Sequence, residues 1–232
     1  MRSKYLYLYL FLVPFASLSQ VTEQSGWLAT FNSIKLNKNW GLHFDMQLRS
    51  ANDLEYAKNL IVRPGLTYFI SDKQNATAGY AFIQTYANPD LIGASDKTEH
   101  RIWQQYIRSY KIKNVPISHR FRLEQRFIEA PGTDIFSQRI RYFFRAVIPL
   151  KTPAGPFTKG LFAGLQNEVF LNLQNKKALN NQVFDQNRFY PSLGYRLSKK
   201  ADIEVGYLNQ YINGAKVDVT NHVAQLAVYS RF

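Results

Sequence analysis

The sequence predicts an all-β protein: a transmembrane, antiparallel, up-and-down β-barrel of about 10–12 strands that follows a cleaved signal peptide. Three observations lead to this fold class. Polar and apolar side chains alternate with a period of two in one segment after another, which is the geometry of an extended strand. The segments run for roughly 10 to 15 residues, enough to cross a bilayer at a tilt, whereas soluble strands average about five or six. No segment after the N-terminus is apolar for long enough to be a transmembrane helix, so any embedding in a membrane has to be by strands.

The first residues predict export. Met1 to Lys4 are basic, Tyr5 to Ala16 are apolar, and Ser17-Leu18-Ser19 forms a small-x-small cleavage site before Gln20. A retained anchor helix is the alternative, but it would need roughly 20 apolar residues. We therefore expect a signal peptide over residues 1–19 and one outer-membrane barrel domain over residues 20–232. The chain has no cysteine, which excludes lipoprotein acylation, disulfides and thiol catalysis.

The composition fits a barrel at a membrane. The chain contains 15 tyrosines and 17 phenylalanines, and aromatic rings that are wet at one end are favoured at membrane interfaces. The formal net charge is +13. Because the lysines and arginines recur at alternate strand positions and do not form a patch, we expect no nucleic-acid partner.

The first expected strand, Trp27 to Leu36, is joined to the second, Trp40 to Ser50, by an asparagine-rich turn, as in a hairpin. The second strand is the clearest, with Trp40, Leu42, Phe44, Met46 and Leu48 on one face and His43, Asp45, Gln47 and Arg49 on the other. Leu60 to Ile70 alternates in the same way, although Pro64 is expected to disturb the pairing there.

The remaining strands are separated by turns rich in Asn, Asp, Gly and Pro. In His119 to Glu129 and in Ile135 to Leu150 one face is unusually rich in arginine. The expected strands after Ile70 are Ala76 to Tyr86, Thr98 to Lys111, His119 to Glu129, Ile135 to Leu150, Gly160 to Leu173, Phe184 to Leu197, Ala201 to Ile212 and Asn221 to Phe232. These segments suggest about eleven strands. Because bacterial single-chain barrels have even strand numbers, ten and twelve are also possible.

The polar faces of the strands should line the lumen, since an arginine on the lipid side at the bilayer midplane costs about 2–4 kcal/mol. Asp45 joins this inward set. The candidate lumen and anion-facing residues are Arg49, Arg63, Arg120, Arg122, Glu124, Arg126, Arg139, Arg141, Arg145, Glu168, Arg188 and Glu204.

Two interpretations of the lumen stay open. The charges can form a salt-bridged filling that closes a narrow barrel, because buried charges are expected to be paired. Alternatively, the excess of arginine makes a small pore that prefers anions, with a small anionic solute as partner. We look for a constriction or a bound anion first at the arginines of His119 to Glu129 and Ile135 to Leu150.

An outer-membrane enzyme acting on lipid or peptide is a third hypothesis, from a different class. Its candidates are His100 beside Glu99, and His43 two residues from Asp45 on one strand face. No nucleophile motif accompanies either pair, and four scattered histidines do not make a metal site. We therefore assign no catalytic residue, metal or cofactor and do not expect an enzyme.

The C-terminal strand ends the chain at Phe232. This resembles the C-terminal signature of bacterial outer-membrane barrels, which implies recognition by the barrel-insertion machinery. The runs Glu99 to Gln105, Arg120 to Phe127, Asn167 to Phe170, Phe184 to Arg188 and Gly206 to Gln210 together resemble domain-of-unknown-function family 2490. That resemblance implies an uncharacterised barrel of the Gram-negative outer membrane, porin-like in architecture, in contact with outer-membrane lipid and common in Bacteroidota. It supplies no activity.

Overall fold

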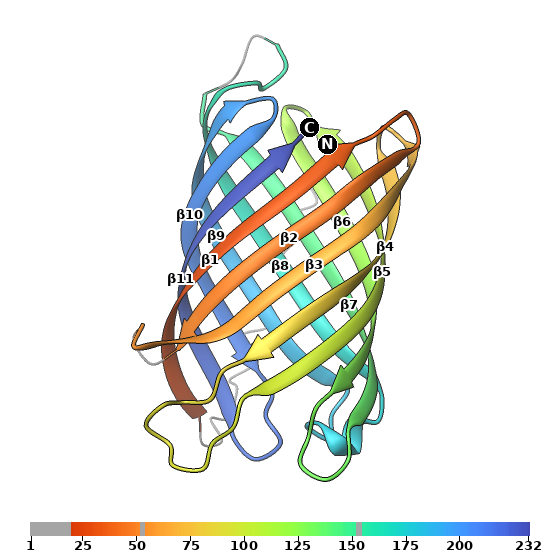
Figure 1. Ribbon diagram of the computed structural model, residues 1–232. Coiled ribbons are helices and arrows are strands. Elements are labelled where there is room, and N and C mark those ends of the chain that lie inside the picture. The colour runs from red at the N-terminus through yellow and green to blue at the C-terminus, as the bar shows by residue number, and fades with distance from the viewer. Residues whose placement is uncertain (1–19, 52–53, 152–154) are drawn as a thin grey trace, which may run out of the picture.

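The computed structural model describes residues 20–51, 54–151 and 155–232. The expected signal peptide, residues 1–19, lies outside the described residues. In the described part of the chain, strands inclined to a common axis close into a barrel (Figure 1). The strands are β1 (Gln20–Lys35), β2 (Trp40–Ala51), β3 (Tyr56–Ser71), β4 (Gln74–Thr85), β5 (Lys97–Ile112), β6 (Val115–Ile128), β7 (Ile135–Pro149), β8 (Gly160–Gln174), β9 (Phe184–Ser198), β10 (Ala201–Ile212) and β11 (Asp218–Arg231). A 3-10 helix, η1 (Lys176–Ala178), lies in the connection from β8 to β9.

Each strand pairs with its sequence neighbours in antiparallel fashion, and the barrel closes between β1 and β11. This last pairing is parallel, with a register from Gln20↔Asp218 to Ser33↔Arg231. An odd number of strands that alternate in direction leaves the first and last pointing the same way, so the closing pair has to be parallel. The eleven strands of the described chain agree with the segments read from the sequence and lie within the expected range of 10–12. The polar residues after Gln20 do not form an extra strand; they lengthen β1.

The barrel is polar inside and apolar outside, and β2 illustrates the division. Leu42, Phe44 and Met46 point outward and are 41%, 39% and 43% exposed, whereas the alternate residues Asp45 and Gln47 are 1% and 6% exposed. A soluble protein buries the first set and exposes the second. The period-two alternation therefore predicts the strand and its two faces correctly.

Pro64 and Pro191, which lie in the middle of β3 and β9, interrupt the ladder on one side. The β3–β4 pairing stops after Val62 and resumes at Gly65, which confirms the disturbance expected at Pro64. The β9–β10 pairing has the same kind of gap over Tyr190 and Pro191. A proline has no N–H to donate to a neighbouring strand, so pairing is lost beside it while the register is kept.

The two ends of the barrel differ. At the end where the C-terminus lies, β3–β4, β5–β6 and β9–β10 are joined by tight turns and β7–β8 by a long connection, residues 150–159, whereas longer loops, such as residues 86–96 and 175–183, project from the opposite end (Figure 1). Phe232 continues the closing pair: its N–H donates to the Ser33 carbonyl at 2.8 Å, and its carbonyl accepts from Lys35 at 2.6 Å. No helix in the described ranges is long and apolar enough to cross a membrane.

Candidate functional site in the barrel lumen

The charged residues expected on the polar faces meet inside the barrel. Asp45, Arg49, Arg63, Arg122, Glu124, Arg139, Arg141, Glu168 and Glu204 are buried there. Arg120, Arg126, Arg145 and Arg188 are half-buried, and each contacts a lumen carboxylate or a lumen ring. The alternation alone places all of them on the inner face.

One side of the lumen carries a group of ion pairs, here called the ion-pair wall and formed by Arg120, Glu124, Arg139, Arg141 and Glu168. Glu124 accepts from Arg139 at 2.7 Å and from Arg141 at 2.5 Å. Glu168 accepts from Arg120 and Arg141, each at 2.7 Å. These residues come from β6, β7 and β8, so the wall links three consecutive strands. The arginine-rich pair β6 and β7, where a constriction was expected, is largely neutralised by carboxylates.

Other pairs extend the network, and several of their members were missed from the sequence. Glu99 accepts from Arg101 at 2.7 Å and from Arg126 at 2.6 Å. Asp185 accepts from Arg139 at 2.6 Å. Glu99 and Arg101 share the inward alternation of Trp103 on β5, and this pattern, followed along the strand, would have identified both.

A third pair of acids lies near the end of the barrel that carries the tight turns. Arg145 donates to Glu204 at 2.6 Å, from 59 residues away in the chain. Asp202 accepts from Arg196 at 2.8 Å and from Arg231 at 2.7 Å. Asp202, Arg196 and Arg231 were not among the expected lumen residues.

Three lumen arginines have no carboxylate within ion-pair distance among the described residues. Arg49 donates to Gln47 at 2.6 Å, Arg122 to Gln105 at 2.6 Å and Arg188 to Gln186 at 3.1 Å. Their guanidinium groups also lie over aromatic rings: Arg49 and Arg188 lie 3.8 and 5.1 Å from the Trp27 ring centre, and Arg122 lies 4.5 Å from that of Trp103. The lumen therefore keeps a surplus of positive charge.

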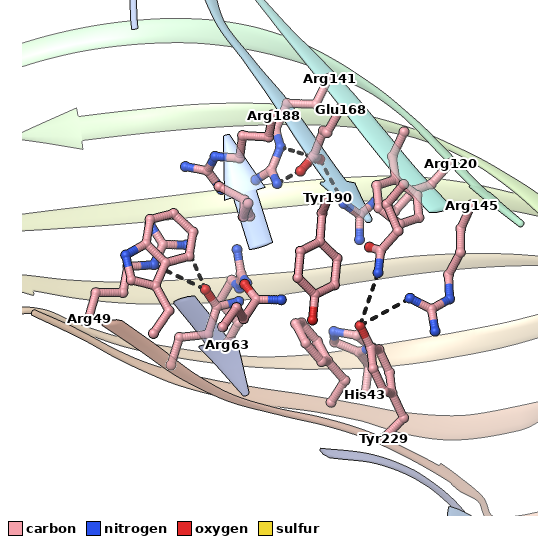
Figure 2. A pocket seen from close by; sticks show the side chains of 17 residues that line it. His43, Arg49, Arg63, Arg120, Arg141, Arg145, Glu168, Arg188, Tyr190 and Tyr229 are labelled. Carbon is pink, nitrogen blue, oxygen red and sulfur yellow. Dashed lines mark hydrogen bonds and ion pairs between the residues drawn. The ribbon is translucent and has the colours of Figure 1, made fainter. Parts of the chain in front are cut away.

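Two cavities lie in the lumen and share four lining residues, Arg49, Arg63, Arg141 and Arg188. The first cavity has a volume of about 250 Å³ and the second about 190 Å³. Figure 2 shows the first cavity, with Arg49 and Arg63 on one side of Tyr190 and Arg145 with Tyr229 on the other. We call the four shared arginines the arginine junction.

The two histidine pairs named as enzyme candidates lie in different places. His43 Nε2–H donates to the Asp45 carboxylate at 3.0 Å, and His43 lines the first cavity, so this pair is brought together inside the barrel. His100 points outward, where it hydrogen-bonds to Tyr80, while the neighbouring Glu99 faces the lumen. His119 and His222 are also hydrogen-bonded to tyrosines on the outer surface.

The enzyme hypothesis rests on His43 and Asp45 alone. None of the described residues that line the first cavity is a serine or threonine, so neither of these nucleophiles accompanies His43 there. Within the described ranges no three histidine, aspartate or glutamate side chains gather closely enough to hold a metal ion.

Comparison with known proteins gives a family without an activity. The family model described as "Protein of unknown function (DUF2490)" matches residues 24–221. An uncharacterised protein of Methylorubrum extorquens is 26% identical over 193 residues, which cover 81% of this chain and 79% of that protein. No solved structure matches the chain significantly. The family resemblance is confirmed; its expected prevalence in Bacteroidota stays a prediction.

Proposed function

Because the chain belongs to DUF2490, a protein family of unknown function, we propose its function from the barrel itself: it spans the bacterial outer membrane and gives small anions a narrow, arginine-lined passage. The end with tight turns faces the periplasm, as in bacterial barrels whose external loops are longer. Phe232, at the periplasmic end, is the contact for the insertion machinery.

The outer face supports the membrane setting. Side chains that point away from the lumen form an apolar belt; examples are Leu48 on β2, Phe121 on β6 and Val205 on β10, which are 41%, 49% and 58% exposed. A soluble monomer rarely exposes contiguous apolar patches larger than a few hundred Å². Lipid tails cover such a belt at no cost, and the inward arginines then avoid the hydrocarbon.

The observation that carries the anion preference is the arginine junction. Its four cations lie where the two cavities adjoin, and Arg49 and Arg188 have no carboxylate partner among the described residues. Rings of cationic side chains favour anions over cations in pores. A solute anion would supply the negative charge that no carboxylate gives these two arginines.

The ion pairs support the plug interpretation for only part of the lumen. In the ion-pair wall the charges of the arginines are compensated by Glu124 and Glu168, and the wall narrows the barrel along β6 to β8. The first cavity lies beside it and is also lined by Trp27 of β1 and Gln225 of β11. We infer that the wall sets the width of the passage and that the surplus arginines set its selectivity.

Planar-bilayer recording tests this proposal. In a KCl gradient the reversal potential should show preference for chloride over potassium. The double variant Arg49→Gln, Arg188→Gln should bring the permeability ratio toward one. Arg196→Gln is the matched control, because it also removes one lumen arginine but lines neither cavity and pairs with Asp202; its ratio should stay close to that of the wild type.

Two outcomes would refute the proposal. A folded barrel that inserts into bilayers but conducts no ions refutes the passage. Recovery of the protein as a soluble periplasmic species, without heat-modifiable migration, refutes the membrane setting itself. Arg141 is unsuitable as the test position, because its loss would also break the ion-pair wall.

A further inference from the structure

The first cavity is amphipathic, which a passage for inorganic ions does not require. Its cationic lining residues include Arg49, Arg63 and Arg188, and its apolar lining includes Trp27, Phe31, Phe143 and Leu208. The second cavity is lined mainly by polar and charged groups, such as Asn59, Thr85 and Glu99. An ion such as chloride gains nothing from apolar walls, whereas an organic anion can bury its carbon skeleton against them.

The cations available to a ligand can be identified from the ion pairs. Arg63, Arg120, Arg141 and Arg145 already donate to carboxylates at 2.6 to 2.9 Å. Arg49 and Arg188 are paired only with glutamines and rings. Both lie over Trp27, so they converge on the same edge of the cavity. A planar carboxylate accepts two parallel N–H donors from a guanidinium, the geometry for which arginine is best suited.

Two buried donors belong to residues that line the first cavity. The Tyr190 hydroxyl is on a side chain only 2% exposed, and neither it nor Arg120 Nε has a hydrogen-bond partner of normal geometry among the described residues. Buried polar groups are nearly always hydrogen-bonded, because leaving one unsatisfied costs free energy. In Figure 2 the Tyr190 ring lies between the arginines on one side and Arg145 with Tyr229 on the other. A small rotation of either side chain toward the cavity would let a ligand oxygen accept from its donor.

We propose that the first cavity binds a small organic carboxylate with an apolar body, held by Arg49, Arg188 and Tyr190 and packed against Trp27, Phe31 and Leu208. The volume of about 250 Å³ is just below the usual range for ligand pockets, about 300–1,000 Å³, so the ligand is small, of the size of a single aromatic ring with its carboxylate. The inference deepens the proposed function and rests on it for one point, that solutes reach the lumen.

Calorimetric titration of the full-length barrel, purified in detergent, tests the site with benzoate as the probe. One benzoate should bind per barrel at millimolar concentrations or below. Benzamide, its neutral analogue, and benzylamine, its cationic analogue, should bind at least about tenfold more weakly, because they lack the charge that the arginines recognise. Inorganic phosphate and chloride should also bind more weakly, because they have no apolar body.

Variants locate the site. Arg49→Gln with Arg188→Gln should weaken benzoate binding about a hundredfold, and Tyr190→Phe, which removes one hydroxyl and little volume, about fivefold to tenfold. Arg196→Gln should leave the affinity within about twofold of the wild type, since Arg196 lines neither cavity and is paired with Asp202. Heat-modifiable migration establishes that each variant is folded.

The outcomes separate this inference from the proposed function. Chloride-selective conductance with no benzoate binding, or with benzoate and phosphate bound equally well, overturns the carboxylate site and leaves the passage intact. Benzoate binding without conductance overturns the passage and keeps the site. Binding that Tyr190→Phe and the double arginine variant do not change would place the ligand elsewhere and overturn the assignment.

Discussion

Replacing Glu124 by glutamine should strongly destabilise the barrel. The Glu124 side chain is 1% exposed, and its two oxygens accept from Arg139 and Arg141, with Arg101 3.7 Å away. Glutamine keeps the volume but removes the charge and places an N–H₂ group where an acceptor is needed. Three neighbouring guanidinium groups then lose the carboxylate that they share.

The magnitude follows from the burial of this cluster. Breaking a buried ion pair by removing one partner costs about 3–5 kcal/mol, because a buried charge loses its partner. Arg139, Arg141 and Arg101 each keep a second carboxylate, from Asp185, Glu168 and Glu99 respectively, so we take the lower end of this range, about 3 kcal/mol. Glu124 lines neither of the two lumen cavities, so little water is at hand to replace it. We expect the free energy of unfolding, measured by denaturant titration in lipid vesicles with tryptophan fluorescence, to fall by about that amount.

Glu23→Gln provides the control. Glu23 also pairs with a cation, Lys58 at 3.4 Å, but the side chains of the two are 26% and 38% exposed, and surface pairs contribute about 0–1 kcal/mol. If Glu124→Gln lowers the free energy of unfolding no more than Glu23→Gln does, the ion-pair wall is as well solvated as surface residues are, and the reasoning from burial fails.

Three further predictions follow from the fold. Met46→Arg, on the outward face of β2, should lower the free energy of unfolding by about 2–4 kcal/mol in lipid vesicles, and an unchanged value would contradict the membrane setting. Gly79→Ala should lower the free energy of unfolding by about 1–3 kcal/mol in the same assay, because its Cβ would lie 2.4 Å from both Trp103 and the Pro64 carbonyl; full stability would show that the Trp103 ring and the backbone at Pro64 both move aside freely. Deletion of Phe232 should reduce the folded barrel in outer-membrane fractions severalfold, while refolding of the same variant in detergent stays efficient; normal membrane levels would remove Phe232 as an insertion signal.

The sequence predicts the faces of the strands well because a strand has a period of two whatever its partners are. Prediction of the strand boundaries fails at the two ends of the chain. β1 was expected from Trp27 but begins at Gln20, and β11 was expected from Asn221 but begins at Asp218. The extra residues alternate weakly, and they are recruited because parallel pairing between the two strands satisfies their backbone groups. A strand count argued from the parity of other barrels could not include that pairing.

The same limit explains why the charged faces were predicted but their partners were not. Glu168 and its partner Arg120 are 48 residues apart in the sequence, and Arg145 and Glu204 are 59 residues apart. Over such separations the sequence spacing carries no geometric information. The partners follow from strand order and register, which exist only once the barrel has closed. Which arginines stay unpaired is therefore a property of the closed barrel.

The parallel closure and the candidate binding cavity are linked through Trp27. On one side of β1, Trp27 is paired with Arg49 of β2; on the other side it is paired with Gln225 of β11. Both partners, like Trp27, line the first cavity. A slip of one residue in the β1–β11 register would turn the Trp27 face of β1 outward relative to β11. The pairing that completes the odd-numbered barrel thus also places Trp27 against Arg49 and Arg188, so a change that shifts this register should abolish carboxylate binding even with both arginines intact.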